Sequence, residues 1–126
     1  MTDYLTAIEV LTIHEDQIER YGGAHGVRDP GLLEAALYRP QTGYYAGLIE
    51  EAAALWESLA QNHPFIDGNK RTAFAVTYTF LVINGAGLQA DPGETYDFIA
   101  GLYEAGGFSF EPLAAWLRRV VVPPEV

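Results

Sequence analysis

The segment from Lys70 to Ile83 constrains the fold most strongly, because apolar side chains occupy nearly every side of its helical repeat. A helix that is apolar all round has to be covered by other elements, so we expect this one at the centre of a bundle. Its most apolar part, residues 75–83, is interrupted by Thr77 and Thr79 and is far shorter than the ~20 residues needed to span a bilayer. The sequence therefore predicts a core helix and no membrane span.

Capping signals place further helices around this one. Thr6 and Glu9 have the spacing of a capping box, and Asp-Pro pairs at 29–30 and 91–92 supply an N-cap followed by proline. The predicted helices cover residues 6–21, 29–38, 48–62, 70–83, 91–105 and 109–120. Strand signals are few, and residues 41–47 fit either a loop or a small hairpin. We therefore predict an all-α protein, a compact bundle of about six helices in one domain over residues 1–126, with at most a short β-hairpin flap.

Helical periodicity also predicts which side chains face the core. The apolar side of the first helix is predicted to comprise Ile8, Leu11, Ile18 and Tyr21. Trp56 and Trp116 are expected in the core, whereas His14 on the first helix is interpreted as a structural histidine. Tyr44 and Tyr45 are expected either to pack or to line a flap that aligns a target peptide by strand addition.

The charge balance narrows the classes of partner. Seven basic and seventeen acidic residues give a formal charge of −10, which disfavours binding to nucleic-acid phosphates and favours a basic partner. The chain has no cysteine, which excludes disulfides and thiolate metal sites, and its first residues lack the basic and apolar regions of a signal peptide. We therefore expect a cytoplasmic protein that binds neither membranes nor nucleic acid directly.

One segment departs from this acidic background, residues 62–72, with the sequence N-H-P-F-I-D-G-N-K-R-T. Its turn residues lead into the predicted helix 70–83, whose first amides have no acceptor within the helix and attract anions. Acidic residues are normally favoured at this end of a helix, yet the first turn holds Lys70, the single lysine of the chain, beside Arg71. A bound polyphosphate would satisfy both the amides and the two cations.

The other side chains of this segment fit phosphate chemistry. Asp67 offers the hard oxygen ligands that Mg²⁺ prefers, commonly together with substrate phosphates. Gly68 lets the backbone approach a phosphate closely, and His63 supplies an imidazole, a frequent general base at neutral pH. The segment thus combines a base, a metal ligand and a cationic phosphate clamp, although a helix end followed by an ordinary turn would use some of the same residue types.

Residues 63–71, H-P-F-I-D-G-N-K-R, resemble the signature of the Fic/Doc superfamily, HPFx(D/E)GN(G/K)R, at every specified position. A second set of segments resembles the death-on-curing (Doc) branch of that superfamily. It consists of Y-G-G at 21–23, G-V-R-D-P-G-L-L-E at 26–34 and R-P-Q at 39–41. Together these resemblances cover most of residues 6–84, and they imply the Fic/Doc fold with Phe65 as a buried anchor of the loop.

The resemblance implies a specific activity. Most Fic enzymes transfer AMP from ATP to a protein hydroxyl and have glycine where this chain has Lys70, whereas the Doc branch has lysine and transfers the γ-phosphate. The protein would then be the toxin of a type II toxin–antitoxin system, a kinase that phosphorylates a threonine of elongation factor Tu and blocks translation. His63 would be the catalytic base, and Asp67 would bind Mg²⁺. The implied residues for binding the phosphates of ATP are Gly68, Asn69, Lys70 and Arg71.

The same resemblance implies the partners. Doc-type toxins pair with a small antitoxin whose tail folds on the toxin, and this chain lacks the internal inhibitory pattern (S/T)xxxE(G/N) of many Fic proteins. Some Doc proteins have asparagine four residues after the motif arginine, where this chain has Ala75. Arg28 is an additional candidate site residue, which could face the nucleotide or the antitoxin, or pair with Asp29 or Glu34 on the surface.

Two alternatives to the kinase remain open at this point. One is a Fic-type adenylyltransferase, because the distinction depends on the single residue Lys70. The other is a non-catalytic module that only binds an antitoxin, which the intact His63, Asp67 and Arg71 argue against. A His63→Ala variant separates the classes, since both enzymes would lose activity and keep antitoxin binding.

Overall fold

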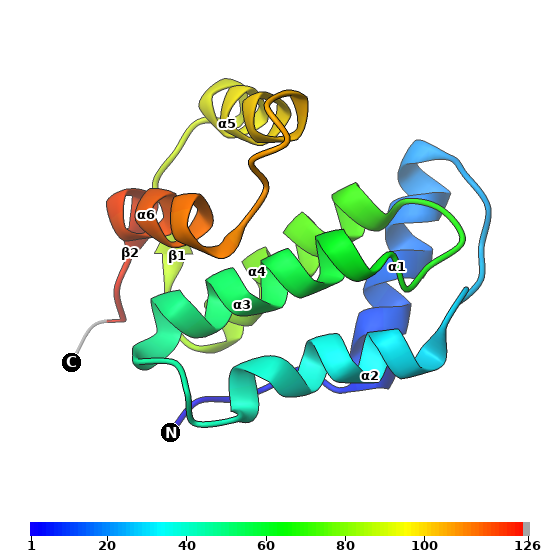
Figure 1. The fold of residues 1–126 in the computed structure, drawn as a ribbon, viewed down its shortest axis with the longest axis horizontal. Coiled ribbons are helices and arrows are strands. Elements are labelled where there is room, and N and C mark those ends of the chain that lie inside the picture. The colour runs from blue at the N-terminus through cyan, green and yellow to red at the C-terminus, as the bar shows by residue number, and fades with distance from the viewer. Residues whose placement is uncertain (125–126) are drawn as a thin grey trace.

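The structure, a computed structural model, describes residues 1–124 and confirms within that range an all-α protein of six helices (Figure 1). In chain order the elements are α1 (Ala7–Tyr21), α2 (Pro30–Tyr38), the 3₁₀ turn η1 (Arg39–Gln41), α3 (Gly47–Asn62), α4 (Asn69–Ile83), β1 (Gly87–Leu88), α5 (Pro92–Glu104), α6 (Phe110–Val120) and β2 (Val121–Val122). The Thr6–Glu9 capping box forms, and the side chains of Asp29 and Asp91 cap α2 and α5 as predicted. Among the described residues, no helix is both long and apolar enough to cross a bilayer.

α3 is the most deeply buried helix, and the other elements pack around it. α4 lies along it on one side, while α2, η1 and α6 contact its remaining sides (Figure 1). Trp56 on α3 is 1% exposed and forms the centre of an aromatic cluster. Its ring centroid lies 5.5–6.4 Å from those of Phe74, Phe98, Phe108 and Trp116. Both tryptophans are therefore in the core, as the sequence predicts.

α4 is covered less completely than its composition predicts. It packs against α3 and α1, but Tyr78, Val82 and Ile83 remain 46%, 48% and 40% exposed. Tyr78 faces a groove between α4 and α5, because α5 buries none of its own residues and leaves that side of α4 open. α3, rather than α4, is therefore the central helix.

The core face of α1 differs from the predicted one. Val10, His14 and Ile18 are buried, whereas Ile8 is 77% and Tyr21 is 66% exposed. The three buried residues follow one another at intervals of four, so they form one line along the helix. Ile18 is therefore predicted correctly and Leu11 packs partly buried against the core, whereas the prediction is wrong for Ile8 and Tyr21. A polar residue, His14, occupies the middle of the buried line, which a pattern of apolar residues alone does not predict.

The strands also lie elsewhere than expected. β1 and β2 form a two-stranded antiparallel sheet between the segment after α4 and the segment after α6, and residues 41–47 form no hairpin. Residues 41–47 precede α3, while the His63 loop follows it, and a helix of 16 residues is about 24 Å long. Tyr45 lies at this distant end, where its hydroxyl accepts a hydrogen bond from Arg39. Of the two alternatives for these tyrosines, the flap is therefore wrong, and Tyr45 packs instead, with its ring centroid 5.5 Å from that of Phe110.

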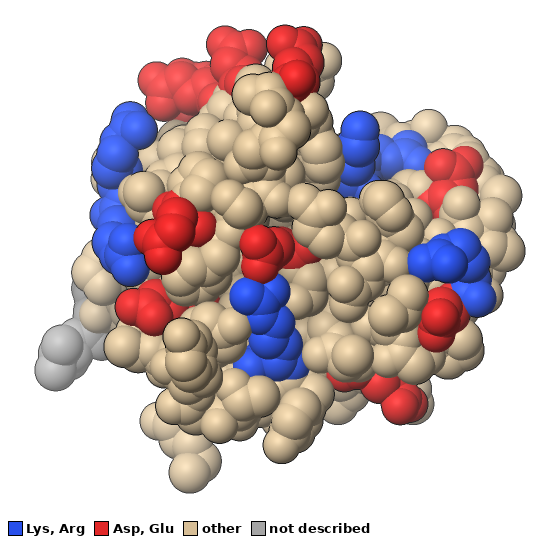
Figure 2. Space-filling model, viewed as in Figure 1, with Lys and Arg blue, Asp and Glu red and all other residues tan. Residues whose placement is uncertain are grey.

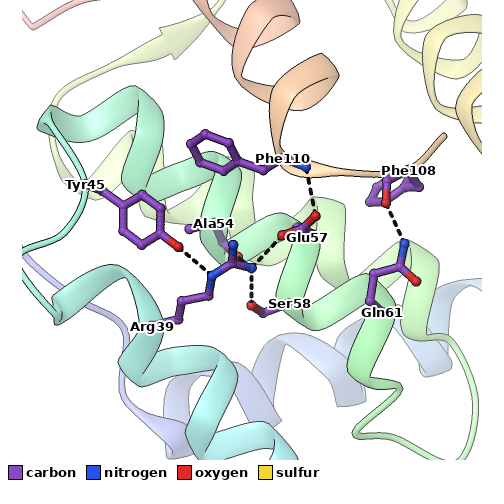
Figure 3. A network of polar contacts seen from close by, with 8 residues as sticks. All are labelled: Arg39, Tyr45, Ala54, Glu57, Ser58, Gln61, Phe108 and Phe110. Carbon is purple, nitrogen blue, oxygen red and sulfur yellow. Dashed lines mark hydrogen bonds and ion pairs between the residues drawn. The ribbon is translucent and has the colours of Figure 1, made fainter.

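Arg39 connects η1 to α3 and, through α3, to α6 (Figure 3). Its guanidinium donates to the hydroxyl of Tyr45 at 2.7 Å, to Glu57 Oε1 at 2.6 Å and to Ser58 Oγ at 2.9 Å. Glu57 in turn accepts a hydrogen bond from the backbone N–H of Phe110, the first residue of α6, at 2.8 Å. Because these groups are partly buried, removing one of them leaves the others without a partner in a poorly solvated position.

Arg39→Leu is expected to lower the free energy of unfolding by about 2 kcal/mol, since the Glu57 carboxylate then loses its cation. Arg20→Leu is a matched control, because Arg20 forms an exposed ion pair with Asp16 on α1, and such pairs contribute less than about 1 kcal/mol. Urea denaturation followed by circular dichroism measures both. Equal losses in the two variants would contradict a structural role for the Arg39 network.

Candidate active site

The loop between α3 and α4 reverses the chain through residues 63–68. His63 ends α3 with φ 48° and ψ 58°, and Gly68 precedes α4 with φ 74° and ψ 20°, so both have the left-handed backbone conformation. Glycine adopts this conformation without steric cost, whereas His63 is the one non-glycine residue of the described chain with a positive φ. These two positions define the shape of the loop.

Side chains from α4 and α1 hold the loop from inside. Asn69 closes it with two hydrogen bonds of 2.9 Å to the backbone of Phe65, accepting from the N–H and donating to the carbonyl. Phe65 is 1% exposed, and its ring stacks on the ring of His14 with centroids 4.0 Å apart. Nε2 of His14 also lies 2.8 Å from the carbonyl oxygen of Asp67 and donates to it. The loop therefore rests on a buried phenylalanine, as expected, and on a histidine of α1.

A second segment, residues 22–29, covers the loop from the other side. The N–H of Arg28 donates to the carbonyl of Pro64 at 2.8 Å, and the N–H of Ile66 donates to the carbonyl of Gly26 at 3.0 Å. These bonds belong to an isolated antiparallel bridge between the two segments. The glycine-rich turn after α1 thus supports the loop as well as connecting two helices.

Asp67 lies exposed at the tip of the loop with both carboxylate oxygens anchored. Oδ2 accepts a hydrogen bond from the N–H of Ala24 at 3.1 Å, and Oδ1 accepts one from the N–H of Gly68 at 2.8 Å. These two bonds, followed by the charge of Arg71, hold the pKa of Asp67 below its usual range. The carboxylate therefore stays ionised and keeps further lone pairs for a hard cation.

The two basic residues in the first turn of α4 extend in different directions. The ammonium of Lys70 lies 4.3 Å from the centroid of the Tyr103 ring on α5, a cation–π contact. Arg71 donates from Nη2 to the carbonyl of Gly22 at 2.8 Å, and its guanidinium lies over the ring of Tyr21. Within residues 1–124 neither cation forms an ion pair with a carboxylate, so both charges remain available to an anion.

A hollow of about 430 Å³ brings the predicted site residues together. It is lined by His63, Ile66, Asp67, Gly68, Asn69, Lys70 and Arg71. Within residues 1–124 no side chain caps the N-terminus of α4, so the first amides of this helix can bind an anion. Arg28 does not line the hollow, because its guanidinium instead donates to the backbone carbonyls of Asn62 and His63.

A larger groove of about 1210 Å³ adjoins this hollow and lies between α1, α4 and α5. Lys70 and Arg71 line both spaces, and Ala75 lies in the wall of the groove. The apolar and aromatic residues of its walls include Ile13, Phe74, Tyr78, Tyr96, Ile99 and Tyr103. The groove and the hollow therefore form neighbouring spaces that meet at the two cations.

Sequence reasoning does not find two residues that support this site. His14 is expected to be structural, but no local pattern connects it with Asp67, 53 positions away. Gly23 belongs to the Y-G-G segment that resembles the Doc branch, but the resemblance assigns it no role, and a Cβ at this position would lie 2.7 Å from Oδ2 of Asp67. A further signal in the sequence is redundancy, because Gly22 alone suffices to end the helix and a second glycine indicates a close approach.

Comparison with known proteins agrees with this geometry. The model of a family described as the Fic/DOC family matches residues 4–81. The chain is 50% identical over 96 residues to the toxin Doc of Mycolicibacterium smegmatis, with 72% of each chain covered. It is also 34% identical over 121 residues to the protein kinase doc of Escherichia phage P1, which covers 93% of this chain and 94% of that one. The chain therefore belongs to the Fic/DOC family. Within it, the chain lies on the Doc toxin branch, as its resemblance to that branch implies.

Gly23→Ala is expected to raise the pKa of Asp67 towards its ordinary value, because the added methyl group displaces the carboxylate from the N–H of Ala24. Gly22→Ala is a matched control, because Gly22 also has a positive φ and a Cβ there meets nothing within 4 Å. An NMR titration of the Asp67 carboxyl carbon measures both. Since the folded pKa is depressed, the stability that Asp67 contributes is present above its unfolded pKa and is lost as the pH falls, and Gly23→Ala reduces it. An unchanged Asp67 pKa in Gly23→Ala would contradict this anchoring.

Proposed function

We propose that this protein is a Doc-type toxin that transfers the γ-phosphate of ATP to a hydroxyl group of a protein, with a threonine of elongation factor Tu as the expected target. The observation that carries the proposal is the hollow, where a histidine, an ionised carboxylate and the uncapped, basic N-terminus of a helix face the same space. Catalysis of phosphoryl transfer depends mainly on positioning of the reacting groups and on neutralisation of charge, and this set of groups can supply both. The names of the two relatives, a toxin and a protein kinase, support the same assignment.

Each residue of the hollow has a role in this proposal. The hydroxyl oxygen of the target attacks the γ-phosphorus, and the bond from that phosphorus to the β–γ bridging oxygen breaks, so that ADP leaves. His63, exposed at the hollow, takes the proton of the hydroxyl. The amides at the start of α4, together with Lys70 and Arg71, bind the phosphates. Gly68 supplies the left-handed turn that precedes these amides, and Asn69 keeps the loop closed.

Asp67 fits the role of a protein ligand for Mg²⁺. Within residues 1–124 no group of three or more His, Asp or Glu side chains could hold a metal ion, and Mg²⁺ commonly binds through one or two carboxylates together with substrate phosphates. When bound, Mg²⁺ would neutralise charge on the phosphates. The depressed pKa of Asp67 keeps its carboxylate ionised in mildly acidic solution, which supports a role as a ligand.

Lys70 favours transfer of the γ-phosphate over transfer of AMP. Its side chain lines the hollow and continues towards α5, where the ammonium contacts Tyr103, so it fills space that a glycine would leave open. Burial raises the pKa of Tyr103 to about 12, which keeps the phenol neutral beside this cation. A triphosphate that cannot extend past Lys70 would present its terminal phosphate to His63.

Intact-mass spectrometry of elongation factor Tu, incubated with this protein, ATP and Mg²⁺, tests the proposal. We expect a gain of one phosphoryl group, at a rate that falls about a hundredfold to ten-thousandfold in His63→Ala because the general base is lost. His25→Ala is a matched control, since His25 is exposed and pairs with Glu19 outside the hollow.

The other outcomes of this measurement are equally informative. A gain of one AMP would show that Lys70 does not direct the nucleotide and would favour the adenylyltransferase. No gain of mass would contradict elongation factor Tu as the target. A gain at an unchanged rate in His63→Ala would contradict the assignment of the base.

We propose further that the partner is a small antitoxin, whose tail folds into the groove between α1, α4 and α5. The groove is large and mainly apolar, and no residue of α5 is fully buried, so this face of the bundle leaves apolar side chains of α4 and α5 partly exposed. Acidic side chains gather over α5 (Figure 2), which carries the exposed residues Glu94, Asp97 and Glu104. An amphipathic tail with basic residues would complement both the apolar walls and this acidic edge.

Tyr96→Arg is expected to weaken binding of the antitoxin at least tenfold (about 1.4 kcal/mol), because it places a cation and removes a ring in the wall of the groove. Tyr44→Arg makes the same change at an 84% exposed tyrosine that precedes the N-terminus of α3, outside the groove, and it is expected to bind normally. Titration calorimetry with the proposed antitoxin measures both variants. Equal affinities for the two would contradict the groove as the binding surface.

A further inference from the structure

We propose that Arg28 is a positioning residue, which holds the peptide groups at the end of α3 and thereby fixes the direction of the His63 imidazole. The proposal rests on the role of His63 in the proposed function. It assigns Arg28 to the back of the catalytic loop, rather than to the nucleotide, the antitoxin or a surface ion pair.

The backbone of His63 needs such support. His63 has a left-handed conformation, which a non-glycine residue adopts rarely and keeps only where its surroundings hold it. This conformation sets the direction of the Cα–Cβ bond of His63, and with it the region that the imidazole can reach. Relaxation of His63 to a right-handed or extended conformation would turn the imidazole away from the hollow.

Arg28 binds three successive peptide groups at this point. Its Nε donates to the carbonyl of His63 at 2.7 Å, and its Nη2 donates to the carbonyl of Asn62 at 2.8 Å. Its backbone N–H donates to the carbonyl of Pro64 at 2.8 Å. The planar guanidinium offers both side-chain donors in one fixed geometry, which a lysine cannot reproduce.

The local electrostatics favour the same arrangement. The last carbonyls of a helix have no partner within it and carry the negative end of its macrodipole, so a cation there is stabilising. α3 has no basic residue in its own last turn, and Arg28 supplies the charge from a different segment. The described residues show no ion pair of Arg28 with Asp29 or Glu34, and Arg28 does not line the hollow.

Steady-state kinetics of phosphoryl transfer give the first test. Arg28→Ala is expected to lower kcat about tenfold to a hundredfold with little change in the KM for ATP, because a base displaced by about 1 Å transfers the proton less efficiently while the phosphate site is intact. Arg28→Lys keeps the charge but replaces the planar pair of donors with a single nitrogen, and it is expected to give an intermediate kcat. Arg119→Ala removes an equal charge from the exposed side of α6 and is expected to leave both constants unchanged. A raised KM with unchanged kcat would overturn the proposal.

A double-mutant cycle separates positioning of His63 from any other effect. In a His63→Ala background, Arg28→Ala is expected to cause no further loss of rate, because the group that it positions is gone. A loss by the same factor as in the wild type would show that Arg28 acts independently of His63, and would overturn the proposal.

The ¹³C chemical shifts of His63 Cα and Cβ report its backbone conformation without any activity assay. In Arg28→Ala they are expected to move away from left-handed values, while the far-ultraviolet circular dichroism stays that of the folded protein. Unchanged shifts would overturn the proposal. Shifts that move as expected, in a protein that phosphorylates no target, would uphold the role of Arg28 and contradict the proposed function alone.

Discussion

The reversal between α3 and α4 is the constraint on which the rest of the structure depends. It requires left-handed backbone at His63 and at Gly68, and bonds from opposite sides hold the peptide groups between them. Asn69 and His14 bind the loop from inside, and residues 22–29 bind it from outside. Because α3 and α4 pack along one another in the core, a change in this loop would disturb both the packing of the bundle and the shape of the hollow.

The two cations at the start of α4 link the proposed catalytic and regulatory surfaces. Lys70 and Arg71 line the hollow on one side and the groove on the other, and they contact Tyr103 on α5 and the end of α1 respectively. A ligand in the groove and a phosphate in the hollow would therefore share these side chains. Sharing of this kind couples the two binding events, and the coupling acts equally in both directions.

Features set by neighbouring residues are predicted from the sequence, and features set by distant ones are not. The caps at Thr6, Asp29 and Asp91 need only a side chain and an amide three residues on, and all three form as predicted. The residues that line the hollow come together for the same reason, since they lie within one loop and the first turn of α4. The roles of His14 and Gly23 depend on contacts with Asp67, which lies far away in the chain, so the sequence does not reveal them. The β1–β2 pairing is missed for the same reason, since it joins two separate segments. The incorrect prediction for α4 has a different cause. Its apolar composition predicts that other helices cover it on every side, but α5 leaves one side of it partly exposed.

The most direct test of the central claim, that the loop presents the terminal phosphate of ATP to His63, is a crystal structure with Mg²⁺ and a non-hydrolysable ATP analogue. The account predicts that the γ-phosphate lies against the first amides of α4 and beside the His63 imidazole, with Asp67 on the metal ion. It also predicts that the adenosine end of the nucleotide points away from His63. An α-phosphate beside His63, or a nucleotide bound outside the hollow, would contradict it.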